Sequence, residues 1–260
     1  MTKDNDFNKA GLLNKSVITS YILKDAPWAD SHGADPGKEY LGAGLLYYTI
    51  AYVLRAKLCV CIGSGGGFVP RLMRQAQMDL GISDARTVLI DANAGKWNRP
   101  KWIDEKSFFR TFYGDIEIII DESSNIFKRG EINNWRIDYL HIDGDHSHKG
   151  SLNDFKNYIR LMSPRGIITF HDTKPHFYYN ITCWKTLCDV RDSNHRIIDF
   201  PWIGNGTAII QMSNYLEHSS VLDMSYRQRI FGFISMIKRR IKAKIKLLHQ
   251  KIIYKADKIT

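Results

Sequence analysis

The sequence has no apolar run long enough to cross a membrane. The longest such stretch, 43–54, has 12 residues, whereas a spanning helix needs about 20. The first residues of the chain also lack the apolar core of a signal peptide, so we expect none. Cysteine is scarce, and no second Cys pair at zinc-type spacing accompanies Cys59 and Cys61. We therefore expect a cytoplasmic protein with reduced, structural thiols at its four cysteines, Cys59, Cys61, Cys183 and Cys188.

The positive charge is confined to one end of the chain. Residues 225–260 hold 11 of the 37 Lys and Arg residues and a single acid, Asp257. The remainder, 1–224, holds 26 basic and 26 acidic residues, so the net charge of +10 belongs to an appendage. The overall content of 44% hydrophobic and 25% charged residues is ordinary for a globular domain.

Apolar segments of strand and helix type alternate along the middle of the chain. The pattern predicts helices at 39–55, 68–80, 151–162 and 181–190 and strands at 58–63, 87–92, 116–121, 137–143, 166–172, 196–200 and 206–212. Ser151 is the expected N-cap of the third helix, which Pro164 and Gly166 are expected to end. This order predicts an α/β, Rossmann-like fold whose seven-stranded sheet is mostly parallel and ends in an antiparallel hairpin. We assign this domain to residues 40–213, a lid or substrate-side segment to 1–39 and a tail to 214–260.

A glycine-rich loop follows the first predicted strand. Its residues Gly63, Ser64, Gly65 and Gly67 allow a tight turn and a close approach of a ligand to backbone amides. The dinucleotide fingerprint would need a glycine where Phe68 stands. The spacing G-x-G-x-G is instead typical of methyltransferases, which bind the amino-acid end of S-adenosylmethionine there. The alternative is an ordinary glycine-rich turn.

Acids at the ends of the next two predicted strands are candidates for the same cofactor. Asp91 lies 28 positions after Gly63, where a carboxylate can accept hydrogen bonds from ribose hydroxyls. Asp121 ends the third strand, where adenine contacts are expected. Either residue could instead cap a surface turn.

Two neighbouring strand ends carry carboxylates and imidazoles. Asp143 and His146 follow the fourth predicted strand, and His171 and Asp172 end the fifth. Carboxylates converging at the ligand-binding edge of the sheet suit Mg²⁺ or another divalent ion. Such an ion stabilises a forming alkoxide, and His146 is close enough to act as general base. Asp143 is also expected to line the cofactor site. The alternative is that these side chains only cap turns.

The segments IDGDHSHKGSLNDF and LMSPRGIITFHD resemble the metal-dependent O-methyltransferases related to macrocin O-methyltransferase and the cephalosporin hydroxylase-like family. The likeness covers about residues 40–213, and the predicted sheet has the layout of class I methyltransferases. The resemblance implies Asp143 and Asp172 as metal ligands, with His171 beside them, and His146 as the base.

Two positions depart from that family's pattern. His171 stands where the family has a carboxylate, which implies a weaker or differently coordinated metal. Cys61 replaces an acid that usually precedes the glycine loop by two positions. The family name also includes a hydroxylase, but the spacing shows no two-histidine, one-carboxylate triad of the kind that binds iron.

The tail has the pattern of a basic amphipathic helix. Apolar residues recur at steps of three, four and seven, and basic residues surround them: Ile230, Ile234, Ile237, Ile241, Ile245, Leu248 and Ile252, with Arg239, Arg240, Lys242, Lys244 and Lys246. Such a helix binds anionic membrane surfaces, so residues 226–260 predict peripheral attachment to the inner face of the cell membrane. The alternative is packing on the domain or in a homo-oligomer.

Together these features predict an O-methyltransferase that moves a methyl group from S-adenosylmethionine to a sugar hydroxyl of a cell-surface or lipid-linked glycan. One rival is an RNA methyltransferase with the tail as phosphate anchor, but no base-stacking module is evident and the neutral body offers no second basic patch. The other is a non-catalytic cofactor-binding protein held on membranes.

Overall fold

The structure is a computed structural model that describes residues 13–63, 66–92, 107–175, 181–191 and 195–211. The chain divides into two compact units, Met1–Ser213 and Asn214–Thr260. The predicted amphipathic helix falls in the second unit and lies outside the described residues. None of the helices in the described part combines the length and the apolar character that a membrane span requires.

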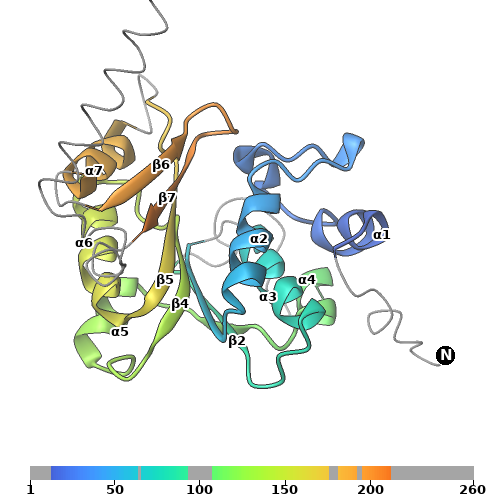
Figure 1. The fold of residues 1–260 in the computed structure, drawn as a ribbon, viewed down its shortest axis with the longest axis horizontal. Helices are drawn as coiled ribbons and strands as arrows, with labels where there is room; N and C mark the ends of the chain where they lie inside the picture. The colour runs from blue at the N-terminus through green and yellow to red at the C-terminus, as the bar shows by residue number, and fades with distance from the viewer. Residues whose placement is uncertain (1–12, 64–65, 93–106, 176–180, 192–194, 212–260) are drawn as a thin grey trace, which may run out of the picture. The chain divides into compact units, whose positions relative to one another are not determined.

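A seven-stranded sheet forms the centre of the first unit (Figure 1). Its spatial order is β3-β2-β1-β4-β5-β7-β6. Neighbours among β1 to β5 are parallel, while β7 is antiparallel to both β5 and β6. The strands are β1 (Leu58–Ile62), β2 (Arg86–Ile90), β3 (Glu117–Ile119), β4 (Ile137–Ile142), β5 (Met162–His171), β6 (Arg196–Phe200) and β7 (Thr207–Gln211). The predicted Rossmann-like α/β fold with an antiparallel terminal hairpin is confirmed.

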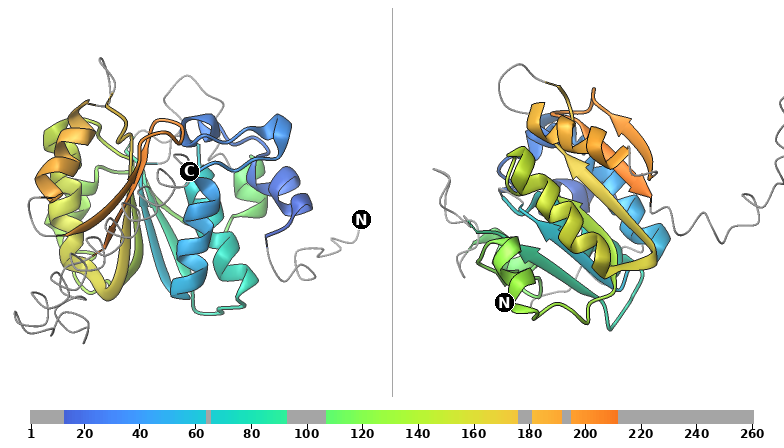
Figure 2. Two further views of the ribbon diagram at one scale, coloured as in Figure 1. Left: turned by 45° about the horizontal axis from the view of Figure 1, so that its top comes forward. Right: turned by 90° about the vertical axis from the view of Figure 1, so that its left-hand side faces the viewer.

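Helices cover both faces of the sheet (Figures 1 and 2). On one face lie α1 (Lys15–Val17), α2 (Gly44–Leu54), α3 (Phe68–Asp79) and α4 (Phe108–Phe112). On the other lie α5 (Ser123–Arg129), α6 (His148–Tyr158) and α7 (Ile181–Arg191). Short turns are η2 (Ile18–Ile22), η3 (Ala29–His32), η4 (Pro36–Lys38) and η5 (Ile159–Leu161).

Strand β1 shows why the sheet is buried on both sides. Cys59 and Cys61 pack in the core beneath α2 and α3, whereas Val60 and Ile62 pack in the core beneath α5 to α7. This alternation follows from the two-residue period of a strand, and a continuous apolar run is typical of a doubly covered parallel strand. The two thiols thus lie on one face of the strand, and all four cysteines are free.

Helix α6 begins earlier than the sequence indicated. Ser147, not Ser151, is the N-cap, because its hydroxyl accepts from the backbone N–H of Gly150 at 3.0 Å. Ser151 instead lies inside the helix and donates to the carbonyl oxygen of Ser147 at 2.8 Å. Two serines at helical spacing both fit a cap pattern, and the structure selects the first because Asp145 also accepts from its backbone N–H and hydroxyl.

Strand β5 also begins earlier than expected. Pro164 and Gly166 lie within it, although they were expected to end the preceding helix. That helix ends at Tyr158 and is followed by η5. The pairing of β5 with β4 shifts register between Ile137 and Tyr139. Pro164 has no backbone N–H to donate to the neighbouring strand, and this irregular pairing accommodates it.

The N-terminal segment is fixed to the domain by Arg71 of α3, whose side chain is fully buried. Its Nη1 donates to the carbonyl oxygens of Tyr21, Ile22 and Lys24 at 3.2, 3.2 and 2.5 Å. Its Nη2 donates to the carbonyl of Asp25 at 2.9 Å. A planar guanidinium with several donors suits such an array of acceptors. Residues 13–39 therefore pack on the same core as the sheet.

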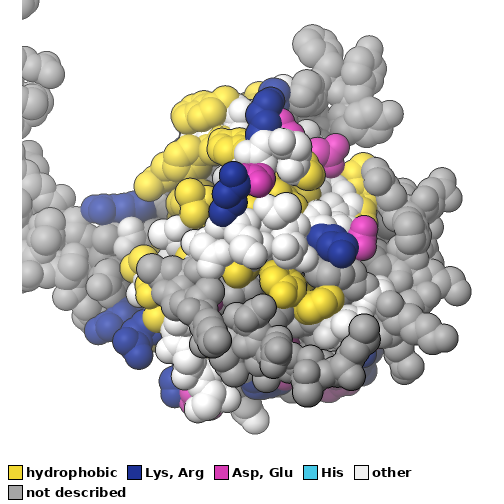
Figure 3. Space-filling view, turned by 90° about the vertical axis from the view of Figure 1, so that its right-hand side faces the viewer, with side chains coloured by type: hydrophobic (Ala, Val, Ile, Leu, Met, Phe, Trp, Pro, Cys, Tyr) yellow, Lys and Arg dark blue, Asp and Glu magenta, His cyan; other side chains and the backbone are white. Residues whose placement is uncertain are grey.

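The face on the right-hand side of Figure 1 is mixed in character (Figure 3). Basic and acidic side chains stand close together there, between patches of hydrophobic side chains. Ion pairs in the N-terminal region join Lys15 to Glu39 at 2.7 Å and Lys38 to Asp35 at 2.9 Å. Among the described residues, this face therefore does not form the single-sign basic patch that nucleic acid would favour.

Candidate active site

The site lies where the strand order reverses, between β1 and β4, which is the usual ligand crevice of an open α/β sheet. Gly63 follows β1 and Asp143 follows β4. The backbone N–H of Asp143 donates to the carbonyl of Ile62 at 2.8 Å. Gly63 has φ +67°, and a Cβ atom there would stand 2.1 Å from the backbone oxygen of Asp143. Only glycine fits at this position, because any side chain would collide with the backbone of Asp143. The glycine loop and the Asp143 carboxylate therefore lie close together at adjoining strand ends.

Gly66 of the glycine loop lies against the N-terminal segment. Gly67 caps α3 with φ +76°. A Cβ atom on Gly66 would stand 2.3 Å from the carbonyl oxygen of Pro27. Ser64 and Gly65 lie outside the described residues. The cofactor roles of this loop stay predictions, but its position beside Asp143 is the one they require.

The two other cofactor candidates lie in different surroundings. Asp91 is buried at the end of β2, and its backbone N–H donates to the carbonyl of Ile119 at 3.0 Å. Asp121 is engaged locally: its carboxylate accepts from Arg129 at 2.6 Å and from Asn125 at 3.1 Å. These bonds, led by that from Arg129, lower the pKa of Asp121. Asp91 is thus buried at the strand end where an acid for the ribose is expected, whereas the carboxylate of Asp121 is paired with Arg129 and Asn125.

The predicted carboxylate and imidazole cluster is brought together. Nε2 of His146 lies 3.1 Å from Oδ2 of Asp172 and 3.5 Å from Oδ1 of Asp143. Nδ1 of His171 lies 3.0 Å from Oδ1 of Asp143 and 3.6 Å from Oδ1 of Asp172. The two acids from neighbouring strands therefore face one another, as sharing a metal ion would require.

Asp172 reaches the site through an unusual backbone conformation. Successive residues of a strand point to opposite faces, yet both His171 and Asp172 face Asp143. Asp172 has φ +56°, in the left-handed region that residues other than glycine seldom adopt. Such strain is concentrated at functional sites. This turn delivers two consecutive side chains to one cluster.

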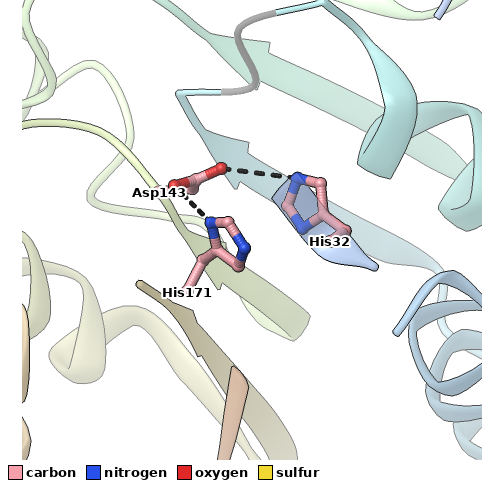
Figure 4. Close-up of side chains that lie close together, drawn as sticks. All are labelled: His32, Asp143 and His171. Atoms are coloured by element: carbon pink, nitrogen blue, oxygen red, sulfur yellow. Dashed lines mark hydrogen bonds and ion pairs between the residues drawn. The ribbon is translucent and has the colours of Figure 1, made fainter. Parts of the chain in front are cut away.

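His32 completes the cluster, although no sequence pattern indicated it. Its Nε2 lies 3.7 Å from Oδ2 of Asp143, and its ring stacks on that of His171 with centroids 3.9 Å apart (Figure 4). His32 ends η3, in a segment without apolar periodicity, so no pattern placed it at a strand end. The spacing showed no two-histidine, one-carboxylate set, but the fold assembles one from His32, Asp143 and His171.

Backbone hydrogen bonds hold η3 against the sheet edge. The carbonyl of His32 accepts from the N–H of Ala43 at 2.9 Å. The carbonyl of Ser31 accepts from the N–H of Asn205, in the β6–β7 connection, at 2.8 Å. The same Ser31 carbonyl accepts from Nε2 of His171 at 3.2 Å. His32 is thereby positioned by three separate parts of the chain.

The carboxylates and imidazoles shift one another's protonation. Burial alone would raise the pKa of Asp143, but His171, His146 and His32 around it hold that pKa well below its usual range. Burial opposes the charged form of His171, yet Asp143 raises its pKa overall. The hydrogen bond to Asp143 raises the pKa of His146 to about 9. Metal-free, the site therefore holds ionised Asp143 beside a protonated His146 at neutral pH.

The two deepest histidines behave differently. Burial lowers the pKa of His141 to about 3, and burial followed by the charge of His171 lowers the pKa of His32 well below its usual value. Both rings are neutral at neutral pH, the form in which an imidazole binds metal. The metal-binding atoms of His32, Asp143 and His171 all lie within 4.8 Å of one another, as do those of Asp143, His146 and Asp172. The residues present thus fit a divalent ion.

Residues 60–173 match the family described as a methyltransferase domain. The matched segment runs from β1 through the glycine loop to the residue after Asp172. An uncharacterized protein, y4gI, of Sinorhizobium fredii is 24% identical over 188 residues, which are 69% of this chain and 20% of that protein. The chain therefore spans about a fifth of the length of the curated relative it matches.

Solved methyltransferases have the same fold. The SAH-bound methyltransferase PaMTH1 of Podospora anserina has a TM-score of 0.56 at 15% identity, covering 78% of this chain and 89% of its own. An O-methyltransferase of Bacillus cereus in complex with SAH has a TM-score of 0.55 at 13% identity, covering 77% and 93%. TomG of Streptomyces achromogenes, in complex with SAM, has a TM-score of 0.52 at 14% identity, covering 76% and 95%. The fold is that of a Rossmann-like methyltransferase.

Proposed function

We propose that the chain is an S-adenosylmethionine-dependent O-methyltransferase that acts on a sugar hydroxyl of a cell-surface or lipid-linked glycan. The observation that carries the proposal is the convergence of Asp143, Asp172 and His146 beside Gly63 at the ligand edge of the sheet. The methyltransferase-domain match and the O-methyltransferases among the similar structures support the reaction class.

The cofactor would lie over the glycine loop. Backbone groups of the loop would hold the amino-acid end, and the buried carboxylate of Asp91 would accept from the ribose hydroxyls. Asp121 would contribute by its place at the end of β3, since its carboxylate is engaged by Arg129. When bound, S-adenosylmethionine supplies a methyl group that its sulfonium already activates. The loop residues would be Gly63, Ser64, Gly65 and Gly67.

The protein must then align the acceptor and take its proton. Asp143, Asp172 and His171 would hold a divalent ion, which stabilises a developing oxyanion. Nε2 of His146 would accept the proton of the hydroxyl. The raised pKa of His146 keeps this nitrogen protonated at neutral pH. It can act as a base only when another cation compensates the two carboxylates that face it.

Exposed aromatic residues beside the site favour a sugar acceptor. Trp202 is 72% exposed and lies in the β6–β7 connection. A Cβ on Gly204 of this connection would stand 2.1 Å from the carbonyl of Ser31, so the connection adjoins η3. Trp28, 41% exposed, immediately precedes η3. The flat apolar face of an indole is a suitable support for the apolar face of a sugar ring.

A methyl-transfer assay tests the proposal. Labelled S-adenosylmethionine would be offered with lipopolysaccharide and polysaccharide fragments, and with RNA before and after ribonuclease treatment. We expect label on a glycan, and loss of turnover in Asp143→Ala with cofactor affinity kept within a few-fold. Asp189→Asn, at a surface acid paired with His148, is the matched control.

Each other outcome contradicts a defined part of the proposal. Label on intact RNA alone would identify an RNA methyltransferase. Cofactor binding without turnover on any acceptor would favour a non-catalytic protein. An equal collapse of cofactor affinity in Asp143→Ala would contradict the assignment of Asp143 to the acceptor side.

A further inference from the structure

Three buried imidazoles surround one carboxylate. His32 comes from η3, His141 from β4 and His171 from β5, and each side chain is at most 3% exposed. The nitrogen of each ring that faces Asp143 lies 3.7, 4.0 and 3.0 Å, respectively, from a carboxylate oxygen. Figure 4 shows two of these rings, His32 and His171, each facing one oxygen of the carboxylate. The arrangement is far richer in nitrogen than the acidic site that the sequence predicted.

The outward nitrogen of every ring is fixed by a polar group. In the neutral form that binds a metal, His171 donates from Nε2 to the carbonyl of Ser31 at 3.2 Å, so Nδ1 directs its lone pair toward Asp143. Histidines that ligate metals nearly always have their second nitrogen held in this way. For the other two rings, Nδ1 of His32 lies 3.1 Å from the hydroxyl of Tyr47, and Nδ1 of His141 lies 2.7 Å from that of Thr169.

Both hydroxyls can accept from those rings. Tyr47 is also bonded to the hydroxyl of Thr207 at 2.9 Å, so it can donate there while accepting from His32. Thr169 likewise has a second hydroxyl partner, Tyr139, at 3.0 Å. The tautomers that direct Nε2 lone pairs of His32 and His141 inward are therefore compatible with the surrounding hydrogen bonds.

One inward nitrogen has no partner of its own. Nε2 of His141 is fully buried and makes no hydrogen bond within the part of the chain that the structure describes. Its distance of 4.0 Å to Asp143 exceeds a hydrogen bond. A buried polar atom without a partner destabilises the fold, so its retention needs an explanation. This nitrogen faces the cluster, where an ion would give it favourable surroundings.

We propose that His32, Asp143 and His171 bind a divalent first-row transition ion such as Zn²⁺, with His141 beside it, in preference to Mg²⁺. Ligand atoms bound to one such ion at about 2.0–2.2 Å lie about 3–3.5 Å apart. The distance of 3.0 Å between Nδ1 of His171 and Oδ1 of Asp143 already matches this spacing. Nε2 of His32, at 3.7 Å from Oδ2 of Asp143, needs only a small shift. Imidazole nitrogens suit zinc, iron, cobalt and nickel, whereas Mg²⁺ takes oxygens.

The inference changes the metal of the proposed function and rests on that function only for the location of the site. Ion binding needs no acceptor and no methyl transfer. The proposed site includes His32 as a metal ligand, so the N-terminal segment is part of the site and not only a cover over it.

Metal binding can be measured on the full chain without turnover. After chelator treatment, Zn²⁺ and Mg²⁺ would be titrated by calorimetry and bound metal counted by elemental analysis. We expect one Zn²⁺ per chain, bound at least about 100-fold more tightly than Mg²⁺. His32→Gln should weaken Zn²⁺ at least about 100-fold, and Tyr47→Phe, which frees the outward nitrogen of His32, about 10- to 100-fold. His148→Gln, on the surface of α6, is the matched control and should bind as the wild type does.

Equal affinity for the two ions, or unchanged Zn²⁺ binding in His32→Gln, would overturn the inference. Should His32→Gln fail to fold, the visible spectrum of the wild-type Co²⁺ complex decides. Intense bands indicate a low-coordinate site with nitrogen ligands, and weak bands indicate a six-coordinate oxygen site that contradicts the inference. Methyl transfer without Zn²⁺ binding would contradict the metal-site inference but not the proposed function. Zn²⁺ binding without methyl transfer would contradict the proposed function but not the metal-site inference.

Discussion

His146 and Asp143 stand three residues apart and face one another across the end of β4, with Nε2 and Oδ1 separated by 3.5 Å. This carboxylate is the largest cause of the raised pKa of His146. The pair therefore sets whether the proposed base carries its proton.

We expect Asp143→Asn to lower the pKa of His146 from about 9 toward its ordinary value of 6.5. An NMR pH titration of the metal-free protein would measure it. Asp189→Asn serves as control, because its carboxylate contacts His148 instead. A pKa of His146 that stays near 9 in Asp143→Asn would show that other groups hold the proton.

Arg71→Met should destabilise the fold by about 3 kcal/mol or more. The substitution removes a buried guanidinium that satisfies four backbone carbonyls of the N-terminal segment. Urea unfolding measures the loss. Arg74→Met, one turn away and paired with Asp115 near the surface, should cost less than about 1 kcal/mol. Equal effects of the two variants would mean that the segment is held by other contacts.

Asp154 predicts a pH dependence of stability. Burial raises its pKa from 3.8 to about 6. Because the folded-state pKa lies above the unfolded value, its contribution is fully present below pH 3.8 and is lost as pH rises through about 6. As pH rises across this window, the free energy of unfolding of Asp154→Asn should therefore increase relative to that of the wild type, by up to about 1.4 kcal/mol per pH unit.

Urea unfolding at several pH values would follow the difference between Asp154→Asn and the wild type. Asp84→Asn is a control of opposite sign, since the hydrogen bond from Lys57 lowers the pKa of that exposed acid. A difference that does not change with pH would mean that Asp154 ionises normally in the folded protein.

Deleting residues 226–260 should release the protein from anionic liposomes. The ten excess positive charges of residues 225–260 would each contribute up to about 1 kcal/mol near such a surface. Vesicle co-sedimentation measures binding, and vesicles without anionic lipid are the control. Loss of the thermal unfolding transition on deletion would instead assign these residues to the core of the domain or to an oligomer.

The sequence predicted the sheet better than the site. Strands such as 58–62 are short, continuous apolar runs between turn residues, so periodicity and spacing sufficed to place Gly63, Asp143 and Asp172 at one edge. His32 could not be found this way. Its position depends on hydrogen bonds that the Ser31 and His32 carbonyls accept from distant parts of the chain, and such contacts leave no local pattern. The early start of α6 was missed because Ser147 and Ser151 both fit a cap.

The Ser31 carbonyl oxygen has a consequence for access. It joins Asn205 of the hairpin connection to His171 of the cluster, while the next residue supplies the imidazole of His32. Lifting η3 would break both hydrogen bonds and withdraw His32 in a single movement. Loading and release of a ligand at this site would then be coupled to a local unfolding event, whose free energy could be followed by amide hydrogen exchange.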